Sequence, residues 1–289
     1  MKLKKDNFTW LSVLTLIIFT APIILGYLWL FISTFSERTY GLKPVDINGN
    51  FGGLTLKNWA FLGEPDIWLI TANTFLMATF LTMGVLLISS LAGYALSRVN
   101  FKGRKTFLSM TLILHAFPSV TLLIAIYFVL RFISGIPFLG MLFGYNTIGG
   151  VVLVSIALQL PLGIWLMKGF FDGVSWDLER AALIDGCSRW RCWWQIMIPQ
   201  IKPGLAALSI FSFMTGWSSF LIPYTFLTKG NKAVLSTYLN AMMSSDTVSI
   251  QYGVLAAIGL FQLIPILLFY SFTQKYLMKI FSGGSHGGV

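Results

Sequence analysis

Apolar residues gather in six long stretches of the chain, separated by shorter polar segments. The stretches run approximately over residues 10–34, 70–97, 106–131, 147–171, 204–227 and 251–274. A helix needs about 20 apolar residues to cross the hydrocarbon core of a bilayer. The pattern therefore predicts an all-α, polytopic membrane protein. Its six transmembrane helices form one domain over residues 10–274, with a short segment 1–9 before it and a tail 275–289 after it.

The first stretch follows the basic segment MKLKKDNF, which has the charge of a signal-peptide start. Its apolar run is too long for the core of a cleaved signal, and no clear small-residue cleavage site follows it. We therefore expect this stretch to be a retained membrane anchor.

The composition agrees with a protein surrounded by lipid. Hydrophobic residues make up 56% of the chain and charged residues only 10%, whereas soluble domains contain about 25% charged residues. The net charge of +10 could also indicate nucleic-acid binding, but basic loops that set membrane topology explain it better. We expect membrane lipid and no nucleic acid as a partner. Cys187 and Cys192 match neither a CxxC nor a zinc pattern, so no metal site is predicted.

The distribution of basic residues predicts the orientation. With the N-terminus inside, 14 of the 20 Lys and Arg residues fall on the inner side and six on the outer side. Because cytoplasmic loops carry the excess of Lys and Arg, both termini and the polar segment 178–203 are expected in the cytoplasm.

The six stretches contain no acidic residue. A proton- or sodium-driven carrier usually needs an ionisable group at membrane depth, and His115 is the single candidate. A lone His close to Pro118 is more often a packing or pore-lining group than a proton relay. No carboxylate pair or metal cluster indicates an enzyme. Energy for uphill transport would therefore come from another subunit.

Uncharged polar residues within the stretches are candidates for a solute path. Ser212, Thr215 and Ser219 recur at steps of three and four residues, which places them on one face of the fifth helix. They could line an aqueous path for a neutral, hydroxylated solute, or they could simply allow close helix packing. The candidate path residues are His115, Gln159, Ser212, Thr215, Ser219 and Gln262.

The polar segment in the middle of the chain predicts two short helices on the membrane surface. Residues 177–184 favour a helix that Ser175 can cap, and Gly186 ends it. Residues 188–197 favour a second helix with Ser188 as its cap. Pro199 and Pro203 should end this helix before the fifth apolar stretch.

The two faces of this segment differ. Trp190, Trp193 and Trp194 share one face, which is expected against lipid or the helix bundle. Asp185, Arg189 and the Glu179–Arg180 pair are expected on the other face, free for a partner. The alternative is an amphipathic loop without a partner.

This segment resembles the EAA motif of ABC importer permeases. The motif stands here as Arg180-Ala181-Ala182, Asp185-Gly186 and Ile196-Met197-Ile198-Pro199. In that family the segment is the coupling helix, which docks on a cytoplasmic ATPase. The resemblance implies a coupling segment over residues 175–200, with Glu179, Arg180, Ala181, Ala182, Asp185, Gly186 and Arg189 as its candidate contact residues. Arg180 occupies the position of the family's leading Glu and carries the opposite charge.

Further motifs resemble the maltose-type carbohydrate permeases, and specifically their six-span second permease. They are LTLKNW at 54–59, Asn73-Thr74, YALSR at 94–98 with FKGR at 101–104, and Gly216-Trp217. This resemblance implies the type I ABC importer permease fold in a bacterial cytoplasmic membrane.

The resemblance also implies the function. The chain would be the permease subunit of a binding-protein-dependent importer for a sugar or oligosaccharide, working by alternating access. Its partners would be a second permease, two ATP-binding subunits and an extracytoplasmic solute-binding protein. ATP and Mg would bind those partner subunits, and this chain, which lacks a GxxxxGK[ST] run, would hold no cofactor. The alternatives are a polyol, glycerol or glycerol phosphate as solute, or a secondary carrier independent of ATP.

The outer segment 228–250 lies where the resembled permeases reach into their binding protein. Lys229, Lys232 and Tyr238 are its candidate contacts. The alternative is a short connecting loop without a partner.

Overall fold

The computed structural model describes residues 6–46, 48–228, 232–243 and 252–283. The described residues form two compact units. One unit comprises residues up to 68 together with 239–265, and the other comprises residues 69–238 together with those from 266 onward. Three helices contribute to both units: α2 (Pro65–Arg98), α12 (Leu235–Met243) and α13 (Tyr252–Gly283).

The smaller unit joins the first apolar helix to a short hairpin. Helix α1 (Asp6–Thr34) is followed by strands β1 (Arg38–Tyr40) and β2 (Lys43–Val45), which pair antiparallel with Arg38 opposite Val45. The amide of Asn58, in the 3₁₀ helix η1 (Lys57–Gly63), donates to the carbonyls of Ser33, Thr34 and Ser36. The bonds to Ser33 and Thr34 satisfy the last two carbonyls of α1, which have no partner within the helix.

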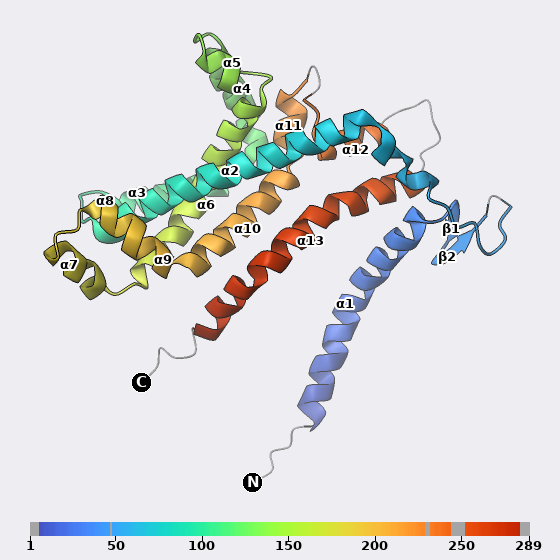
Figure 1. Ribbon diagram of the computed structural model, residues 1–289, viewed down its shortest axis with the longest axis horizontal. Coiled ribbons are helices and arrows are strands. Elements are labelled where there is room, and N and C mark those ends of the chain that lie inside the picture. The colour runs from blue at the N-terminus through green and yellow to red at the C-terminus, as the bar shows by residue number, and fades with distance from the viewer. Residues whose placement is uncertain (1–5, 47, 229–231, 244–251, 284–289) are drawn as a thin grey trace. The chain divides into compact units, whose positions relative to one another are not determined.

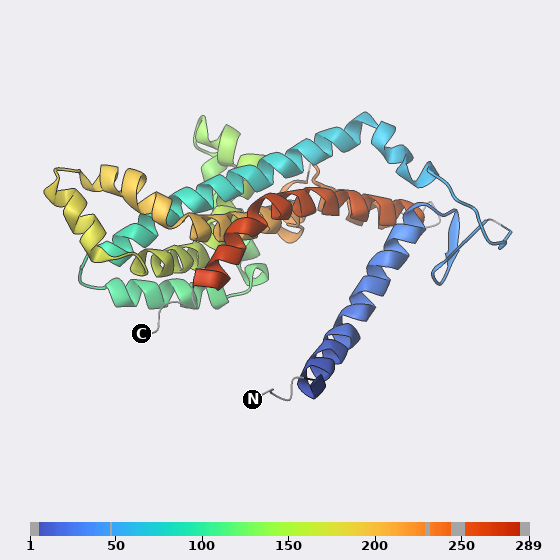
Figure 2. The ribbon, with the colours of Figure 1, turned by 60° about the horizontal axis from the view of Figure 1, so that its bottom comes forward.

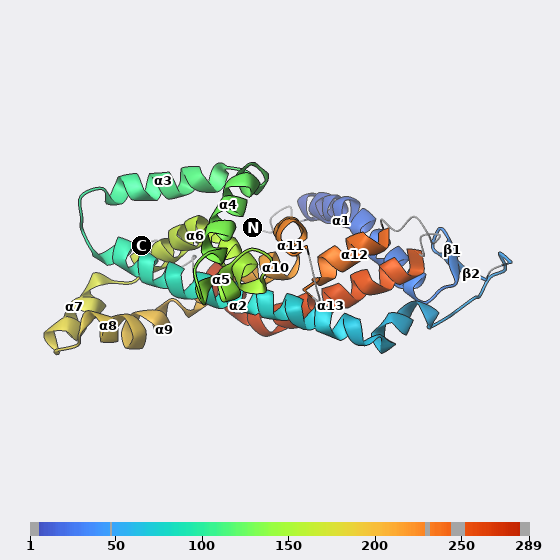
Figure 3. The ribbon, with the colours of Figure 1, turned by 90° about the horizontal axis from the view of Figure 1, so that it is seen from above.

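The larger unit is a bundle with a surface segment, residues 176–200, at one end (Figures 1 and 3). Helices α2, α6 and α10 form its long elements, and α3 packs along α6 (Figures 2 and 3). After α2, the elements of this unit up to residue 226 are, in chain order, α3 (Arg104–Ala116), η2 (Ser119–Leu122), α4 (Leu123–Ser134), α5 (Leu139–Phe143), α6 (Ile148–Asp172), α7 (Trp176–Ile184), α8 (Arg189–Cys192), the π-helical turn η3 (Trp193–Met197), α9 (Ile198–Gln200), α10 (Lys202–Trp217) and α11 (Leu221–Phe226).

The described helices agree with the six predicted stretches, but those of the third and fifth stretches are bent. Among the described residues, four helices can cross a membrane by length and composition, or up to six if each of two bent pairs is one span. The third stretch bends by 96° between α3 and the segment that begins at Ser119. Phe117 is extended there, because a residue that precedes proline disfavours the helical conformation.

The fifth stretch, 204–227, contains one break, and the chain also bends sharply just before it. Helix α10 stops at Trp217 and a new helix, α11, starts at Leu221. Pro223 lies in the first turn of α11, where a missing N–H costs little. At its other end, α10 meets the helical segment 189–200 at an angle of 81°. The last stretch continues as α13 to Gly283, beyond the expected start of the tail at residue 275.

Close contact between α2 and α6 depends on a glycine. A Cβ atom added to Gly93 would lie 2.8 Å from the Met167 Cβ and 2.8 Å from the Lys168 backbone nitrogen. Small residues let transmembrane helices approach in this way. The contact draws the end of α2 against the end of α6, where the surface segment begins.

Candidate functional site

The surface segment folds as two short helices around a glycine turn, which confirms the predicted layout. The Ser175 hydroxyl caps α7 by accepting from the Asp177 N–H at 3.2 Å, and the Ser188 hydroxyl caps α8 by accepting from the Arg191 N–H at 3.3 Å. Gly186 has a φ of +87°, a conformation that glycine adopts without steric cost. It turns the chain between the end of α7 and the start of α8.

The second helical run ends at Gln200, before α10, as expected, but Pro199 lies within that run and does not close it. The chain passes from α8 through the π-helical turn into α9, and Pro199 lies in the first turn of α9. Pro203 likewise lies in the first turn of α10. Pro203 suits its position because the first-turn N–H groups of α10 have no partner within that helix.

The three tryptophans do not share one environment. Trp193 is buried, whereas Trp190 and Trp194 are 64% and 61% exposed. Trp193 belongs to a core cluster with Ala182 of α7 and with Tyr94 and Phe171 of the long helices. The surface segment is therefore held to the bundle by the apolar packing of Trp193.

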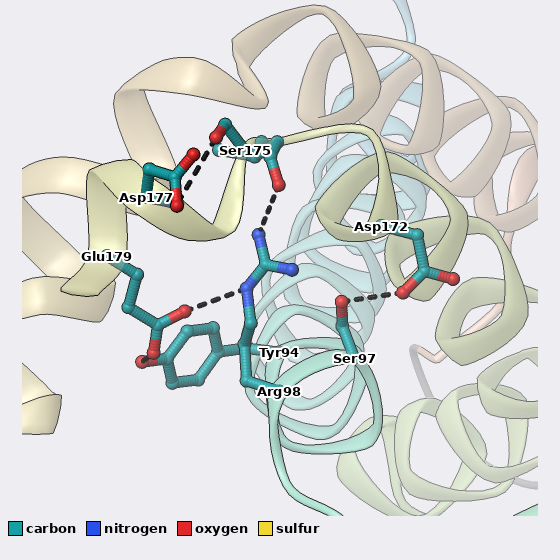
Figure 4. A network of polar contacts seen from close by, with 8 residues as sticks. Tyr94, Ser97, Arg98, Asp172, Ser175, Asp177 and Glu179 are labelled. Carbon is teal, nitrogen blue, oxygen red and sulfur yellow. Dashed lines mark hydrogen bonds and ion pairs between the residues drawn. The ribbon is translucent and has the colours of Figure 1, made fainter.

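A buried ion pair fixes α7 to the end of α2 (Figure 4). Arg98 Nε lies 2.7 Å from Glu179 Oε2, and the two side chains are 0% and 2% exposed. The Tyr94 hydroxyl donates to Glu179 Oε1 at 2.6 Å. The expectation that Glu179 lies on the free face is therefore wrong. Successive residues of a helix point about 100° apart, and the turn that exposes Arg180 directs Glu179 into the bundle.

Further contacts complete this network. Arg98 Nη2 donates to the Val174 carbonyl at 2.7 Å, and the guanidinium lies 4.7 Å from the centre of the Trp176 ring. The hydroxyl of Ser97, the residue before Arg98, donates to Asp172 Oδ1 at 2.6 Å (Figure 4). The end of α2 thus holds together the end of α6, the linker of residues 173–175 and helix α7.

The outward face of the segment carries the other motif residues. The Arg180 side chain is 68% exposed, 3.9 Å from Asp177, and its guanidinium lies 5.9 Å from the Trp176 ring. Ile184 is 85% exposed. Ala181, Asp185, Gly186 and Arg189 are exposed as well, whereas Ala182 is buried. A charged and apolar surface of this kind suits a protein partner.

Four of the six candidate path residues line one cavity. The cavity has a volume of about 310 Å³ and lies among α2, α3, α6, α10 and α11, next to both helix breaks. Its polar lining consists of His115, Ser119, Ser155, Gln159, Thr215 and Ser219. The twelve residues that line it include no Asp, Glu, Lys or Arg.

Ser212 lies behind this cavity and supports it. Gln159 Nε2 donates to the Ser212 hydroxyl at 3.1 Å, and both residues are buried. Gln159 Oε1 is buried without a hydrogen-bond partner among the described residues. A buried amide oxygen without a partner is costly, which suits an acceptor for a hydroxylated solute. Gln262 is half-buried on α13 within the smaller unit.

Sequence reasoning does not find several residues of these two sites. Arg98 and Tyr94 stand out only as parts of the YALSR signature, and a basic residue that ends an apolar stretch usually indicates topology alone. Ser155 stands four residues before Gln159, a spacing that places both on one helix face and could have identified it. Ser119 follows Pro118, and its position is evident only from the helix break.

The candidate binding-protein contacts are only partly described. Lys229 lies outside the described residues. Lys232 donates to the Asn146 carbonyl at 2.7 Å, and Tyr238 is half-buried on α12. Among the residues that the structure describes, no group of three or more His, Cys, Asp or Glu side chains could hold a metal ion.

Comparisons with known proteins agree on one family. The family model described as binding-protein-dependent transport system inner membrane component matches residues 84–279. The diacetylchitobiose uptake system permease protein NgcG of Streptomyces coelicolor is 28% identical over 286 residues, which are 96% of this chain and 89% of that protein. The maltose/maltodextrin transport system permease protein MalG of Escherichia coli is 29% identical over 218 residues, covering 75% and 70% of the two chains.

The fold also has a counterpart among solved structures. A chain of a bacterial ABC transporter involved in the import of the acidic polysaccharide alginate superimposes with a TM-score of 0.78 at 22% identity, covering 96% of this chain and 99% of that one. The expected ABC importer permease fold is therefore confirmed. With a family match over most of its length, this chain belongs to the inner membrane components of binding-protein-dependent transport systems.

Proposed function

We propose that this chain is the permease subunit of an ATP-driven importer for a sugar or oligosaccharide, working by alternating access. The observation that carries the proposal is the surface segment α7–α9, whose outward face is free of the bundle while its inward face is fixed to α2 by a buried ion pair. The relatives NgcG and MalG are named for diacetylchitobiose and for maltose and maltodextrin, which supports a carbohydrate over a polyol or glycerol phosphate. Family membership favours an importer subunit over an ATP-independent carrier.

The assembly would contain four kinds of protein. A second permease would pair with this chain, and two ATP-binding subunits would carry ATP and Mg. A solute-binding protein would deliver the solute from outside. This expectation is supported by a solved bacterial alginate ABC transporter, 16% identical to this chain, that is in complex with an alginate pentasaccharide-bound periplasmic protein. Within the inner membrane, residues 10–274 would form the transmembrane domain, with both termini in the cytoplasm. Tyr238, with Lys229 and Lys232, would contact the binding protein.

The geometry supports a route for the coupling of ATP hydrolysis to transport. Closure of the ATP-binding subunits would displace the outward face, which carries Arg180, Ile184 and Asp185. Since Glu179 is bonded to Arg98 and Tyr94, the displacement of α7 would move the end of α2. Helix α2 also lines the 310 Å³ cavity through Leu81, so the same helix connects the surface segment to the solute path.

Replacing Gly186 with proline tests the coupling role. Proline holds φ near −65°, whereas Gly186 has φ +87° and donates its N–H to the Leu183 carbonyl. We expect binding-protein-stimulated ATP hydrolysis by the reconstituted importer to fall by about tenfold or more, because backbone strain of this kind costs about 1–3 kcal/mol. The matched control is Gly186→Asn, since asparagine tolerates positive φ, and it should retain most of the stimulation. Normal stimulation in an assembled Gly186→Pro importer would contradict the proposal.

Replacing Gln159 with leucine tests the solute path. The change removes the unpaired amide oxygen and the Ser212 hydrogen bond at nearly constant volume. If Gln159 binds solute hydroxyls, uptake into proteoliposomes should fall by about tenfold, because one hydrogen bond of a buried group contributes about 1–3 kcal/mol. Stimulated ATP hydrolysis should persist, since α7 and its ion pair are untouched. Gln274→Leu, the same change at an exposed position of α13, is the control. Equal uptake in both variants would remove Gln159 from the path.

A further inference from the structure

A second cavity lies at the turn between α2 and α3, apart from the coupling face and the solute path. Its volume is about 530 Å³, and three basic side chains line it: Arg104 and Lys105 at the start of α3, and Lys168 near the end of α6. Asn100 and Thr106 add polar groups, and Phe101 adds an apolar wall. The function proposed above does not use this cavity.

The charge of this pocket is only partly balanced. Lys168 forms an ion pair with Asp172. Neither Arg104 nor Lys105 forms an ion pair within the described part of the chain. Two cations therefore face the cavity without a carboxylate in direct contact, which favours an anionic ligand with several acceptor oxygens.

The backbone adds to this preference. Helix α3 begins at Arg104, and its N-cap, Gly103, provides no side-chain acceptor. The N–H groups of Lys105 and Thr106 donate to no backbone acceptor among the described residues. Such first-turn N–H groups, together with the helix dipole, favour a phosphate or carboxylate.

The surface next to the pocket points to a lipid. Phe107, Met110 and Leu114 are 46%, 58% and 61% exposed, and their spacing of three and four residues places them in one stripe along α3. Phe101, within the pocket lining, is 47% exposed. A basic pocket at the end of a membrane-spanning helix, continued by an exposed apolar stripe, matches the shape of a phospholipid with its headgroup and acyl chains.

We propose that the Arg104–Lys105–Lys168 pocket binds the headgroup phosphate of an anionic phospholipid, whose acyl chains follow the exposed stripe of α3. The pocket is lined by the loop that follows α2, the start of α3 and Lys168 near the end of α6, so an occupied pocket ties these segments together. The lipid would thus stabilise the end of the bundle that carries the coupling segment.

The test measures lipid retention by the full-length chain, purified together with its subunits in discs of phosphatidylcholine and phosphatidylglycerol. Native mass spectrometry measures which lipid stays bound. We expect the wild-type chain to retain phosphatidylglycerol in preference to phosphatidylcholine. The double variant Arg104→Gln, Lys105→Gln should lose this preference by about thirtyfold, since it removes two basic residues that each contribute about 1 kcal/mol near an anionic surface. The matched control, Lys102→Gln with Lys202→Gln, removes two cations that do not line the pocket and should keep the preference.

Several outcomes would overturn the proposal. An equal loss in the control variant would mean diffuse attraction to basic loops, and no preference in wild type would mean no lipid site. Displacement of the lipid by millimolar inorganic phosphate would identify a free phosphate as the ligand. Loss of a co-purifying subunit from the Arg104→Gln, Lys105→Gln variant would identify a protein contact. The charge-conserving variant Arg104→Lys, Lys105→Arg should retain the lipid, which separates a lost site from a misfolded chain.

Discussion

Substitution of Arg98 by alanine is expected to abolish transport and to destabilise the chain strongly. Glu179 would then remain 2% exposed with only the Tyr94 hydroxyl as a partner. Removal of one member of a buried ion pair costs about 3–5 kcal/mol, because the other charge is left without compensation. The loss should appear as a lower melting temperature of the purified chain and as loss of solute uptake into proteoliposomes.

Two controls separate the ion pair from general effects of arginine removal. Arg180→Ala removes an arginine that also lies beside Trp176, but its side chain is 68% exposed. Exposed ion pairs contribute about 0–1 kcal/mol, so this variant should keep its melting temperature. Arg98→Met combined with Glu179→Met removes both charges and should recover much of the stability. If that double variant also transports, the charges are needed only for folding, and the proposed transmission through the ion pair is wrong.

Substitution of Gly93 by leucine is expected to disrupt the contact between α2 and α6. Even a Cβ at this position lies 2.8 Å from Met167 Cβ and from the Lys168 backbone nitrogen, and backbone cannot move away as a flexible side chain can. Overpacking of a close contact costs about 1–3 kcal/mol, occasionally more. The yield of folded chain in membranes and its melting temperature should both fall.

The matched control for this variant lies on the partner helix. A Cβ at Gly169 meets nothing within 4 Å, and the residue is exposed, so Gly169→Leu adds the same side chain to α6 without a clash. Its melting temperature should equal or exceed that of wild type, because leucine favours a helix more than glycine does. Similar losses in both variants would show that glycine is needed for a reason other than the helix contact.

Much of the architecture follows from the sequence alone, because it depends on local properties of the chain. Hydropathy depends on runs of neighbouring residues, so the apolar stretches and their approximate limits can be read directly. The caps at Ser175 and Ser188 and the turn at Gly186 are equally local, since each depends on residues within one helical turn. The family follows from motif spacing in the same way.

The tertiary structure decided which side chains meet. Glu179 and Arg180 look like one exposed pair in the sequence, and only the packing of α7 against α2 shows that one of them is buried on Arg98 and the other is not. Hydropathy also cannot distinguish a straight span from a bent pair of equal length, so it does not predict the breaks near Pro118 and after Trp217. The cavity depends on those breaks, because Ser119 follows the first break and Ser219 lies within the second, and both line the same cavity as Gln159. Contacts between distant segments arise from the relative rotation of whole helices, which no short window of sequence contains.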